Sequence, residues 1–336
     1  MSLKNKYKEF WDKLNQSDSV AIVVHHNPDG DAMGGALGLA NLLGEKAKVV
    51  VPNAYPITLN WLPGVENVID FEVNPVLSSE IILKAQVLIM VDFNTPSRVK
   101  KMEKLIVDAK AFKIMIDHHP FPNETGVDLV FSETQVSSSC ELISDIIDKG
   151  DQFSSVTPQI AMCLYTGIIT DTGSLSHNSS RPETYLLVAK LLQVGFNKDW
   201  VLEQIFQKNR LSQIQLLGFC LSQRLIKLEG YPVAYISLSA NDLIQFDYQQ
   251  GDTEGVVNYP LCIEGISVSA LFIEKDDLVK LSLRSKGNLA VNKLSEKYFG
   301  GGGHLNAAGG ESKLSLAETI VKFETAAKEM IDEISL

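Results

Sequence analysis

The sequence predicts an α/β fold, a mostly parallel sheet flanked by helices, joined by a helical linker to a smaller α+β domain. Three observations support this. The chain has 336 residues, about two domains at roughly 100–200 residues each. Apolar runs of strand length alternate with helical stretches in the first half. After a wholly helical segment, the pattern changes to hairpins. We therefore place the domains at residues 1–195 and 225–336, with the linker at 196–224.

The first domain is predicted to open with an amphipathic helix and to continue with alternating strands and helices. Large apolar residues recur at helical spacing over residues 3–15, and small apolar residues over residues 32–43. Short runs rich in β-branched and apolar residues predict five strands, at residues 20–24, 48–51, 68–71, 86–92 and 111–117. The last two runs are almost uninterrupted, which is typical of strands buried on both faces of a parallel sheet.

The second half of the chain has a different pattern. Residues 137–192 and 198–222 read as helices with no strand between them. Two hairpins are then predicted, the first from residues 225–228 and 232–238, the second from residues 266–273 and 278–283. A helix over 291–299, a run of four glycines and a long helix from residue 315 complete the α+β domain.

Composition restricts the partners. Thirty basic residues stand against 41 acidic ones, for a net charge of −11. No basic stripe of the kind that binds long duplex nucleic acid is present, so we expect no such partner. The four cysteines form no C-x-x-C pair, which disfavours a zinc finger or a disulfide framework. The N-terminus lacks a signal peptide, and no apolar run reaches the roughly 18 residues of a membrane span. We therefore expect a cytoplasmic protein without a membrane partner.

Histidine and aspartate gather where predicted elements end. Three segments follow strands: His25-His26-Asn27-Pro28-Asp29-Gly30-Asp31, Val91-Asp92 and Ile116-Asp117-His118-His119. A fourth closes an apolar helix at Asp171. Four of the six histidines lie in the two doublets. Ligands of open α/β sheets bind beyond the carboxyl ends of the strands, so these segments predict a single site.

Each segment has a simpler interpretation when it is taken alone. The sequence N-P-D-G is a good turn, and Asp92 could be a cap. Their joint occurrence favours a metal site. Imidazole and carboxylate ligands suit Mn²⁺, Fe²⁺ or Zn²⁺, and a carboxylate-rich set favours Mn²⁺ or Mg²⁺. Two ions about 3.5–4 Å apart can activate a water and stabilise the leaving oxygen of a phosphoester. We expect two divalent ions, Mn²⁺ or Mg²⁺.

These four segments, in this order, resemble the four motifs of the DHH phosphoesterase family. Residues 300–304 and 307–310, GGGGH and AAGG, resemble the DHH-associated domain of its first subfamily. The resemblance covers nearly the whole chain and is nearest to the short RecJ-like branch. It implies hydrolysis of short oligoribonucleotides to mononucleotides and of 3′-phosphoadenosine 5′-phosphate (PAP) to AMP. A phosphodiesterase of cyclic or linear dinucleotides, or a non-catalytic nucleotide-binding module, are the alternatives, and a homodimer is left open.

The resemblance also implies roles for individual residues. One ion would be held by His25, Asp29 and Asp92, and the second by Asp31, Asp92, His118 and Asp171, so that Asp92 bridges them. The catalytic set would be His119 at the scissile phosphate, Asp92, and Arg98 near the phosphate. His26 departs from the family pattern and could be a spare ligand or only a neighbour. Residues 174–178 also depart from it, which leaves contacts from that loop open.

The second domain is expected to hold the rest of the substrate across a cleft. The resemblance implies that the base and the terminal phosphate are bound by Arg284, Ser285, Gly301, Gly302, Gly303 and His304. Glycine lets a backbone approach a ligand closely and expose its N–H groups. The simpler interpretation makes Arg284 a surface cation, the glycines a flexible linker and His304 a polar residue beside a helix.

Overall fold

The computed structural model describes residues 3–335, and the chain divides into two compact units. Unit 1 ends at Lys208 and unit 2 begins at Asn209. The expected linker is helical and is divided between the units. Its first helix, α8 (Lys198–Phe206), belongs to unit 1, and its second, α9 (Leu211–Phe219), belongs to unit 2.

Unit 1 contains a six-stranded, wholly parallel sheet in the order β3-β2-β1-β4-β5-β6. Its strands are β1 (Val20–Val24), β2 (Ala47–Val51), β3 (Ile69–Asp70), β4 (Val87–Val91), β5 (Phe112–Asp117) and β6 (Leu129–Ser132). Every residue of β1 and β4 is buried, as their uninterrupted apolar sequences predict. The strand order reverses between β1 and β4, and such a switch point is where ligands of open sheets bind.

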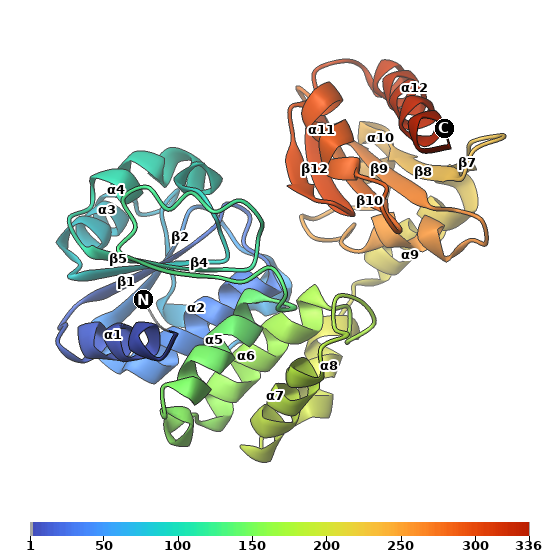
Figure 1. Ribbon diagram of the computed structural model, residues 1–336. Helices are drawn as coiled ribbons and strands as arrows, with labels where there is room; N and C mark the ends of the chain where they lie inside the picture. The colour runs from blue at the N-terminus through green and yellow to red at the C-terminus, as the bar shows by residue number, and fades with distance from the viewer. Residues whose placement is uncertain (1–2, 336) are drawn as a thin grey trace. The chain divides into compact units, whose positions relative to one another are not determined.

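Helices cover both faces of this sheet (Figure 1). One core lies between the sheet and α1 (Leu3–Asn15), α2 (Gly30–Leu43), α5 (Ser139–Lys149) and α6 (Pro158–Asp171). The other lies against α3 (Pro75–Lys84) and α4 (Glu103–Asp108), and α7 (Pro182–Gln193) packs on α5 and α6. The predicted α/β class and the strands and helices named above are confirmed. Strand β6 was not predicted, because its four residues alternate in burial at the sheet edge.

Unit 2 is built on a second six-stranded sheet, in the order β11-β12-β10-β9-β8-β7. Its strands are β7 (Leu225–Lys227), β8 (Val233–Leu238), β9 (Val268–Glu274), β10 (Val279–Ser285), β11 (Gly302–His304) and β12 (Ala307–Ser312). The β8–β9 pair is parallel and the others are antiparallel. Helices α11 (Val291–Phe299) and α12 (Leu316–Ser335) cover one face; α9 and the short α10 (Ala240–Gln245) contribute to the core on the other. Both predicted hairpins are present.

The glycine run is ordered structure. Gly300 ends α11 in the left-handed conformation, with φ of 59°, and Gly302 starts β11. A Cβ atom on Gly301 would lie 1.8 Å from the carbonyl oxygen of Gly309, and one on Gly303 would lie 2.4 Å from that of Ala307. Two of the four glycines are therefore required by close backbone packing in the β11–β12 hairpin.

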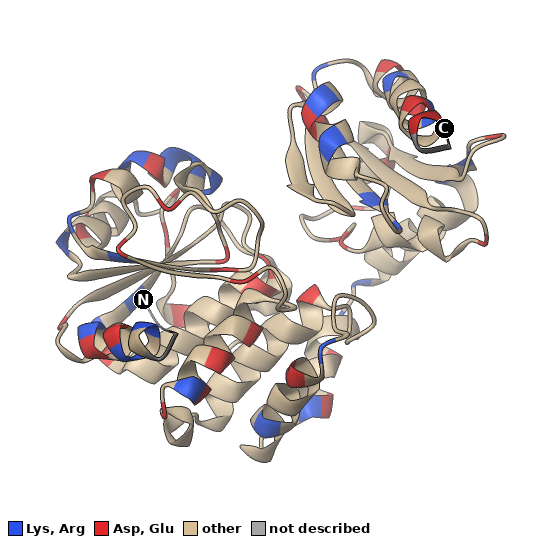
Figure 2. Cartoon of the chain, viewed as in Figure 1, with Lys and Arg blue, Asp and Glu red and all other residues tan. Residues whose placement is uncertain are grey.

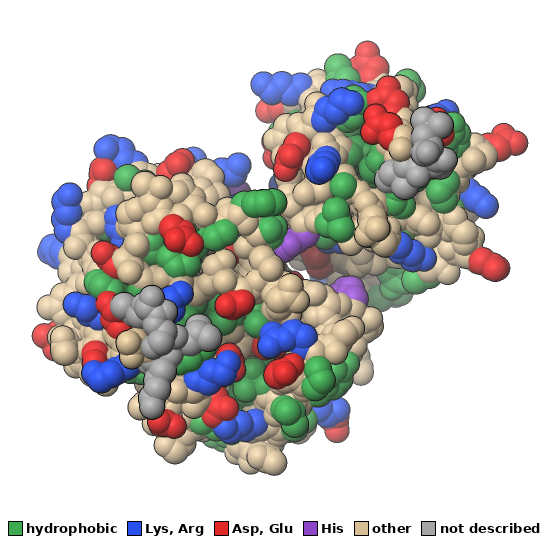
Figure 3. All heavy atoms as spheres, in the orientation of Figure 1, with side chains coloured by type: hydrophobic (Ala, Val, Ile, Leu, Met, Phe, Trp, Pro, Cys, Tyr) green, Lys and Arg blue, Asp and Glu red, His purple; other side chains and the backbone are tan. Residues whose placement is uncertain are grey.

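The surface agrees with the composition. Lys and Arg alternate with Asp and Glu along α1, α7 and α12 (Figure 2). Apolar side chains are scattered among polar ones on the face of each unit in view in Figure 3. Among residues 3–335, no helix is long and apolar enough to span a membrane.

Candidate metal and phosphoester site

The candidate site lies at the carboxyl ends of the central strands of unit 1. His25 follows β1 and Asp92 follows β4, and these neighbouring strands are paired up to Val24 and Val91. Asp117 ends β5, the next strand, and His118 and His119 follow it. Helix α6 brings Asp171, its last residue, to the same place. Residues far apart in sequence therefore meet because parallel strands end at one edge of the sheet.

Asp92 lies between two groups of candidate ligands. Its Oδ2 is 3.3 Å from Nε2 of His25, and this histidine nitrogen is 3.8 Å from Oδ2 of Asp29. Its Oδ1 is 3.5 Å from Nε2 of His118. The same nitrogen of His118 lies 3.9 Å from Asp31 and 3.6 Å from Asp171. Each side of the Asp92 carboxylate thus faces a separate group.

Each group could hold a metal ion. Ligand atoms of His25, Asp29 and Asp92 lie within 4.8 Å of one another, as do those of Asp31, His118 and Asp171. The donors are carboxylate oxygens and imidazole nitrogens, with no thiolate, which suits Mn²⁺ or Mg²⁺. His26 belongs to neither group. Its backbone N–H donates to the carbonyl oxygen of Arg98, 2.9 Å away, so it joins the β1 loop to the Arg98 turn.

A second contact links Asp117 to His119. The Oδ1 atom of Asp117 is 2.7 Å from Nδ1 of His119, and its Oδ2 accepts the backbone N–H of the same residue at 3.0 Å. Asp117 is fully buried, so it holds the ring in one orientation with Nδ1 as the donor. The sequence placed Asp117 in the motif but gave it no role.

Helix α5 contributes hydrogen-bond donors that the sequence did not reveal. The backbone N–H groups of Ser139 and Cys140 donate to the two oxygens of Asp31, at 2.6 and 2.9 Å. The hydroxyl of Ser139 donates to Oδ1 of Asp92 at 3.0 Å. The pattern Ser138-x-x-Glu141 is a sequence signal for a helix start, because the Ser138 hydroxyl caps the Glu141 N–H. It does not indicate which carboxylates the helix start will face.

Two loop residues adopt the left-handed conformation at this edge. Asp92 has φ of 64° and Asn27 has φ of 57°, values uncommon for residues other than glycine and tolerated best by Asn and Asp. The backbone N–H of Asp92 donates to Ile116 on the adjacent strand, and Asn27 exchanges hydrogen bonds with the side-chain amide of Asn53. These contacts hold the ligand-bearing loops in a strained conformation, which is common at functional sites.

The buried charges perturb one another. Burial and the neighbouring Asp92 raise the pKa of Asp31 to about 7, and burial and Asp31 raise the pKa of Asp171 well above its usual range. Burial opposes the charge of His25, but the hydrogen bond to Asp92 and the charge of Asp29 outweigh it and raise its pKa to about 9. The pKa of His118 also rises to about 9, because Asp92, Asp171 and Asp31 outweigh burial. A cluster that retains protons near neutral pH lacks positive charge, and a divalent cation would supply it.

The remaining predicted residues of unit 1 lie near the cluster. Arg98 is half-buried in a 3-10 helix (Pro96–Met102) that follows β4, and its charge acts on His25. Residues 174–178 follow Asp171 in a tight loop in which Ser174, Leu175 and Asn178 have positive φ. The side chain of Asn178 donates to the carbonyl oxygen of Ser137, before α5.

In unit 2, Arg284 and His304 occupy one row of the sheet. Both pair with Ala307, Arg284 from β10 and His304 from β11, so the three side chains share a face. Two strand spacings place Arg284 and His304 about 10 Å apart. The alternate residues Leu281 and Leu283 face the core under α11 and α12, so this row lies on the opposite face.

Small residues fill the space around this row. Gly302 and Gly309 are paired and lie on the same face, and added Cβ atoms would meet nothing closer than 3.9 and 3.6 Å. Packing therefore does not require these two glycines, unlike Gly301 and Gly303. Ser285, in contrast, is used inside the fold: its hydroxyl donates to Leu289 and accepts from Asn306.

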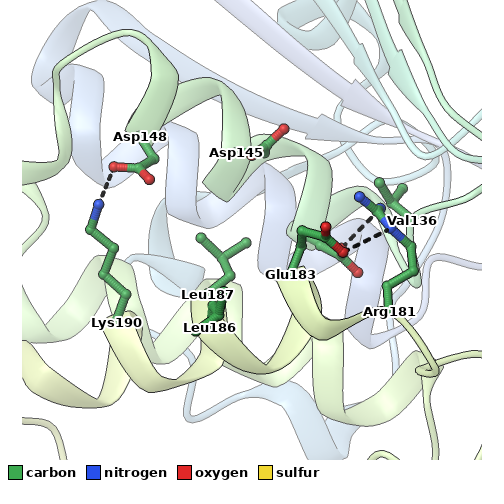
Figure 4. A pocket seen from close by; sticks show the side chains of 9 residues that line it. Val136, Asp145, Asp148, Arg181, Glu183, Leu186, Leu187 and Lys190 are labelled. Carbon is green, nitrogen blue, oxygen red and sulfur yellow. Dashed lines mark hydrogen bonds and ion pairs between the residues drawn. The ribbon is translucent and has the colours of Figure 1, made fainter.

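A pocket of about 200 Å³ between α5 and α7 has none of the candidate site residues in its lining (Figure 4). Arg181 pairs with Glu183 at 3.7 Å and with the buried Glu141 at 3.2 Å, and Lys190 pairs with Asp148. These charged groups form ion pairs with one another. We therefore interpret the pocket as a gap in the packing of α5 against α7.

Comparison with known proteins agrees with the two-unit division. Residues 19–168 match the model of the DHH family, N-terminal domain, and residues 230–334 match the DHHA1 domain. A crystal structure of an exopolyphosphatase-related protein from Bacteroides fragilis has a TM-score of 0.95. The two sequences are 34% identical, and the match spans 99% of this chain and 98% of the Bacteroides chain.

Two relatives have names that state an activity. The bifunctional oligoribonuclease and PAP phosphatase NrnA of Thermus thermophilus is 30% identical, over 90% of both chains. The cyclic-di-AMP phosphodiesterase PdeA of Listeria monocytogenes is 29% identical over 91% of this chain, which matches 46% of the longer PdeA.

We expect the metal-free protein to lose thermal stability as pH rises from about 6.5 to about 9. In this window the folded His25 and His118 hold protons that the unfolded chain has released, so raising the pH favours unfolding. A bound divalent cation would replace those protons, so excess Mn²⁺ should raise Tm more at about pH 8 than at about pH 6.5. Calorimetry in EDTA and in Mn²⁺ measures both effects. Equal increments at the two pH values would contradict the prediction.

The substitution Gly167→Ala should weaken both the fold and metal binding. A Cβ atom there would lie 2.2 Å from Sγ of Cys140 and 2.7 Å from Oδ1 of Asp31, so it would push α6 away from the ligand. Such overpacking costs roughly 1–3 kcal/mol. The control is Gly218→Ala, which meets nothing in helix α9 and should be neutral or stabilising by up to about 1 kcal/mol. Urea unfolding and Mn²⁺ titration of both variants test this, and unchanged Mn²⁺ affinity in Gly167→Ala would contradict it.

Proposed function

The chain belongs to the DHH family, and from this premise we propose that it is a metal-dependent phosphoesterase acting on short oligoribonucleotides and on PAP. The observation that carries the proposal is the position of Asp92. Its two carboxylate oxygens face two separate groups of ligands at the switch point of the sheet. A carboxylate so placed can serve two cations at once, which is what two-metal hydrolysis of a phosphoester needs.

The donor set fits two divalent ions, and we propose Mn²⁺. One ion would be held by His25, Asp29 and Asp92, and the other by Asp31, Asp92, His118 and Asp171. When bound, such ions supply a nucleophilic water at neutral pH and neutralise charge on the phosphate. The surplus of carboxylates over basic groups in the cluster supports this assignment, because the charge of the cations would balance it.

His119 is the proposed catalytic residue at the scissile phosphate. Asp117 fixes Nδ1 of its ring, so Nε2 can donate to a phosphate oxygen or to the leaving group. Arg98 is proposed to hold a phosphate oxygen near the cluster.

Unit 2 is proposed to recognise the remainder of the substrate. Arg284 supplies a cation, His304 supplies an imidazole, and small residues between and beside them leave a flat surface for a base or sugar. Gly302 and Gly303, on the edge strand β11, would offer backbone N–H groups beside this surface, whereas the N–H of Gly301 already donates to the carbonyl oxygen of Ser295. Ser285 supports the Asn306 turn, so we propose that it acts through that turn.

The choice of substrates rests on the relatives. The match to the NrnA relative spans 90% of that protein's length, which supports oligoribonucleotides and PAP as the substrates. The PdeA relative supports the alternative, a phosphodiesterase of cyclic or linear dinucleotides. A non-catalytic nucleotide-binding module is the other alternative. It is disfavoured because every candidate ligand is present and His119 is held in position.

Side-by-side assays with Mn²⁺ test the substrate proposal. The substrates are an RNA dinucleotide, PAP, a cyclic dinucleotide and 5′-labelled RNAs up to about 24 nucleotides. We expect the highest rates on RNAs of two to about five nucleotides, because a net charge of −11 and a sequence without a basic stripe give longer RNA little cationic surface to bind. Equal rates on the shortest and longest RNAs would contradict this expectation. Faster hydrolysis of the cyclic dinucleotide would favour the alternative, and no turnover at all would favour the binding module.

The variants His119→Ala and Asp117→Asn should retain metal and lose turnover, each by roughly 10²–10³-fold. The two oxygens of Asp117 accept the backbone N–H and the ring Nδ1–H of His119. In Asp117→Asn, the NH₂ group takes the place of one oxygen and meets one of these N–H groups. The imidazole then loses its fixed orientation. The control is Asp128→Asn, where a carboxylate also accepts a backbone N–H, from Lys113, far from the cluster. Metal analysis and kcat are measured for all three. Loss of an ion in His119→Ala would make His119 a ligand instead.

The substitution Gly309→Val should raise KM for a dinucleotide about tenfold, which is roughly 1.4 kcal/mol, with a smaller effect on kcat. The strand can accept a β-branched residue, since the nearest atom to an added Cβ is 3.6 Å away. The control is Glu311→Val, on the same face of β12 and further from the Arg284 row. An unchanged KM in Gly309→Val would remove this surface from substrate binding.

A further inference from the structure

We propose that Ser139 is a positioning residue that fixes the direction of the Asp92 carboxylate between the two metal groups. The inference rests on the proposed function, because Asp92 matters here as the bridge. Ser139 directs its two donors to different carboxylates. Its hydroxyl donates to Oδ1 of Asp92 at 3.0 Å, and its backbone N–H donates to Oδ2 of Asp31 at 2.6 Å.

The hydroxyl of Ser139 has no structural task within its own helix. Ser138 is the residue that caps α5, since its side chain accepts the N–H of Glu141 at 3.0 Å. Further along, the hydroxyl of Ser144 bonds to the carbonyl oxygen of Cys140 inside the helix. Ser139 alone among these three donates its hydroxyl to a residue of the candidate site.

The contact selects which lone pairs of Asp92 remain for a cation. A carboxylate oxygen can accept about two hydrogen bonds or metal contacts. With Ser139 on Oδ1, that oxygen keeps one position, on the side of His118, whose Nε2 is 3.5 Å away. Oδ2 keeps its positions on the side of His25. The hydroxyl therefore holds the carboxylate plane so that each oxygen serves one group.

The same contact keeps His119 on its own partner. Nδ1 of His119 lies 2.7 Å from Oδ1 of Asp117. Oδ1 of Asp92 is the next carboxylate oxygen, 3.7 Å from the same nitrogen. Since Ser139 already donates to that oxygen, Asp92 is a weaker competitor for the ring. Removal of the hydroxyl would let Asp92 turn toward His119 and away from the second metal group.

Hydrogen bonds that orient a metal ligand typically contribute 10–100-fold to metal affinity or activity. We expect Ser139→Ala to raise the Mn²⁺ dissociation constant at least tenfold for the weaker ion, and Ser139→Thr, which keeps the hydroxyl, to stay within about threefold of the parent chain. Both are measured by calorimetric titration of Mn²⁺ alone. The control is Ser144→Ala, a fully buried hydroxyl of the same helix, which should leave Mn²⁺ binding unchanged.

Melting in EDTA separates folding from metal binding. If Ser139→Ala does not fold, Ser139→Cys takes its place, because a thiol keeps the volume and is only a weak donor. Parent-like Mn²⁺ binding in the variant that lacks the hydroxyl, equal weakening in Ser144→Ala, or no rescue by a folded Ser139→Thr would each overturn the proposal. So would a parent chain that binds no Mn²⁺. A parent chain that binds Mn²⁺ and hydrolyses none of the substrates contradicts the proposed function alone, and the Ser139 result then still stands.

Discussion

The concentration of negative charge at one edge of the parallel sheet is the constraint on which the rest of unit 1 depends. Asp31, Asp92 and Asp171 all lie within 4 Å of one nitrogen of His118, and the first two are almost fully buried. Burying carboxylates together is unfavourable unless other groups compensate for their charge. The histidines supply part of that compensation, and the N-terminus of α5 supplies more, because its free N–H groups carry partial positive charge.

Close helix packing makes this compensation available. Helices α2, α5 and α6 meet behind the strand ends, and glycines at the contacts let them approach. At Gly34 an added Cβ would lie 2.5 Å from the backbone of Cys163, and at Gly167 it would lie 2.2 Å from Cys140. Gly34 belongs to the stretch of small residues that predicted a helix over residues 32–43. The task of these glycines is to bring the start of α5 within hydrogen-bond distance of Asp31.

The sequence predicted the sheet and the ligand-bearing loops because both depend on local pattern. Uninterrupted apolar runs mark β1 and β4, and the charged residues that follow them lie at the strand ends by necessity. The role of Ser139 could not be predicted, because a serine near a helix start is common and its target is 47 residues away in the chain. Strands β11 and β12 were missed for a different reason: glycine and alanine carry no strand periodicity, and only their neighbours show that they pair.

On our proposal, the glycine-rich hairpin serves both the fold and a ligand. Gly301 and Gly303 are required by the backbone of β12, since any side chain there would overlap a carbonyl oxygen. Gly302 and Gly309 meet no such obstacle, and they lie on the face that carries Arg284 and His304. A larger residue at these two positions would fit the fold and gain strand propensity. Their small size therefore needs a reason outside the fold, and our proposal supplies one, because small residues beside a cation and an imidazole leave room for a nucleotide.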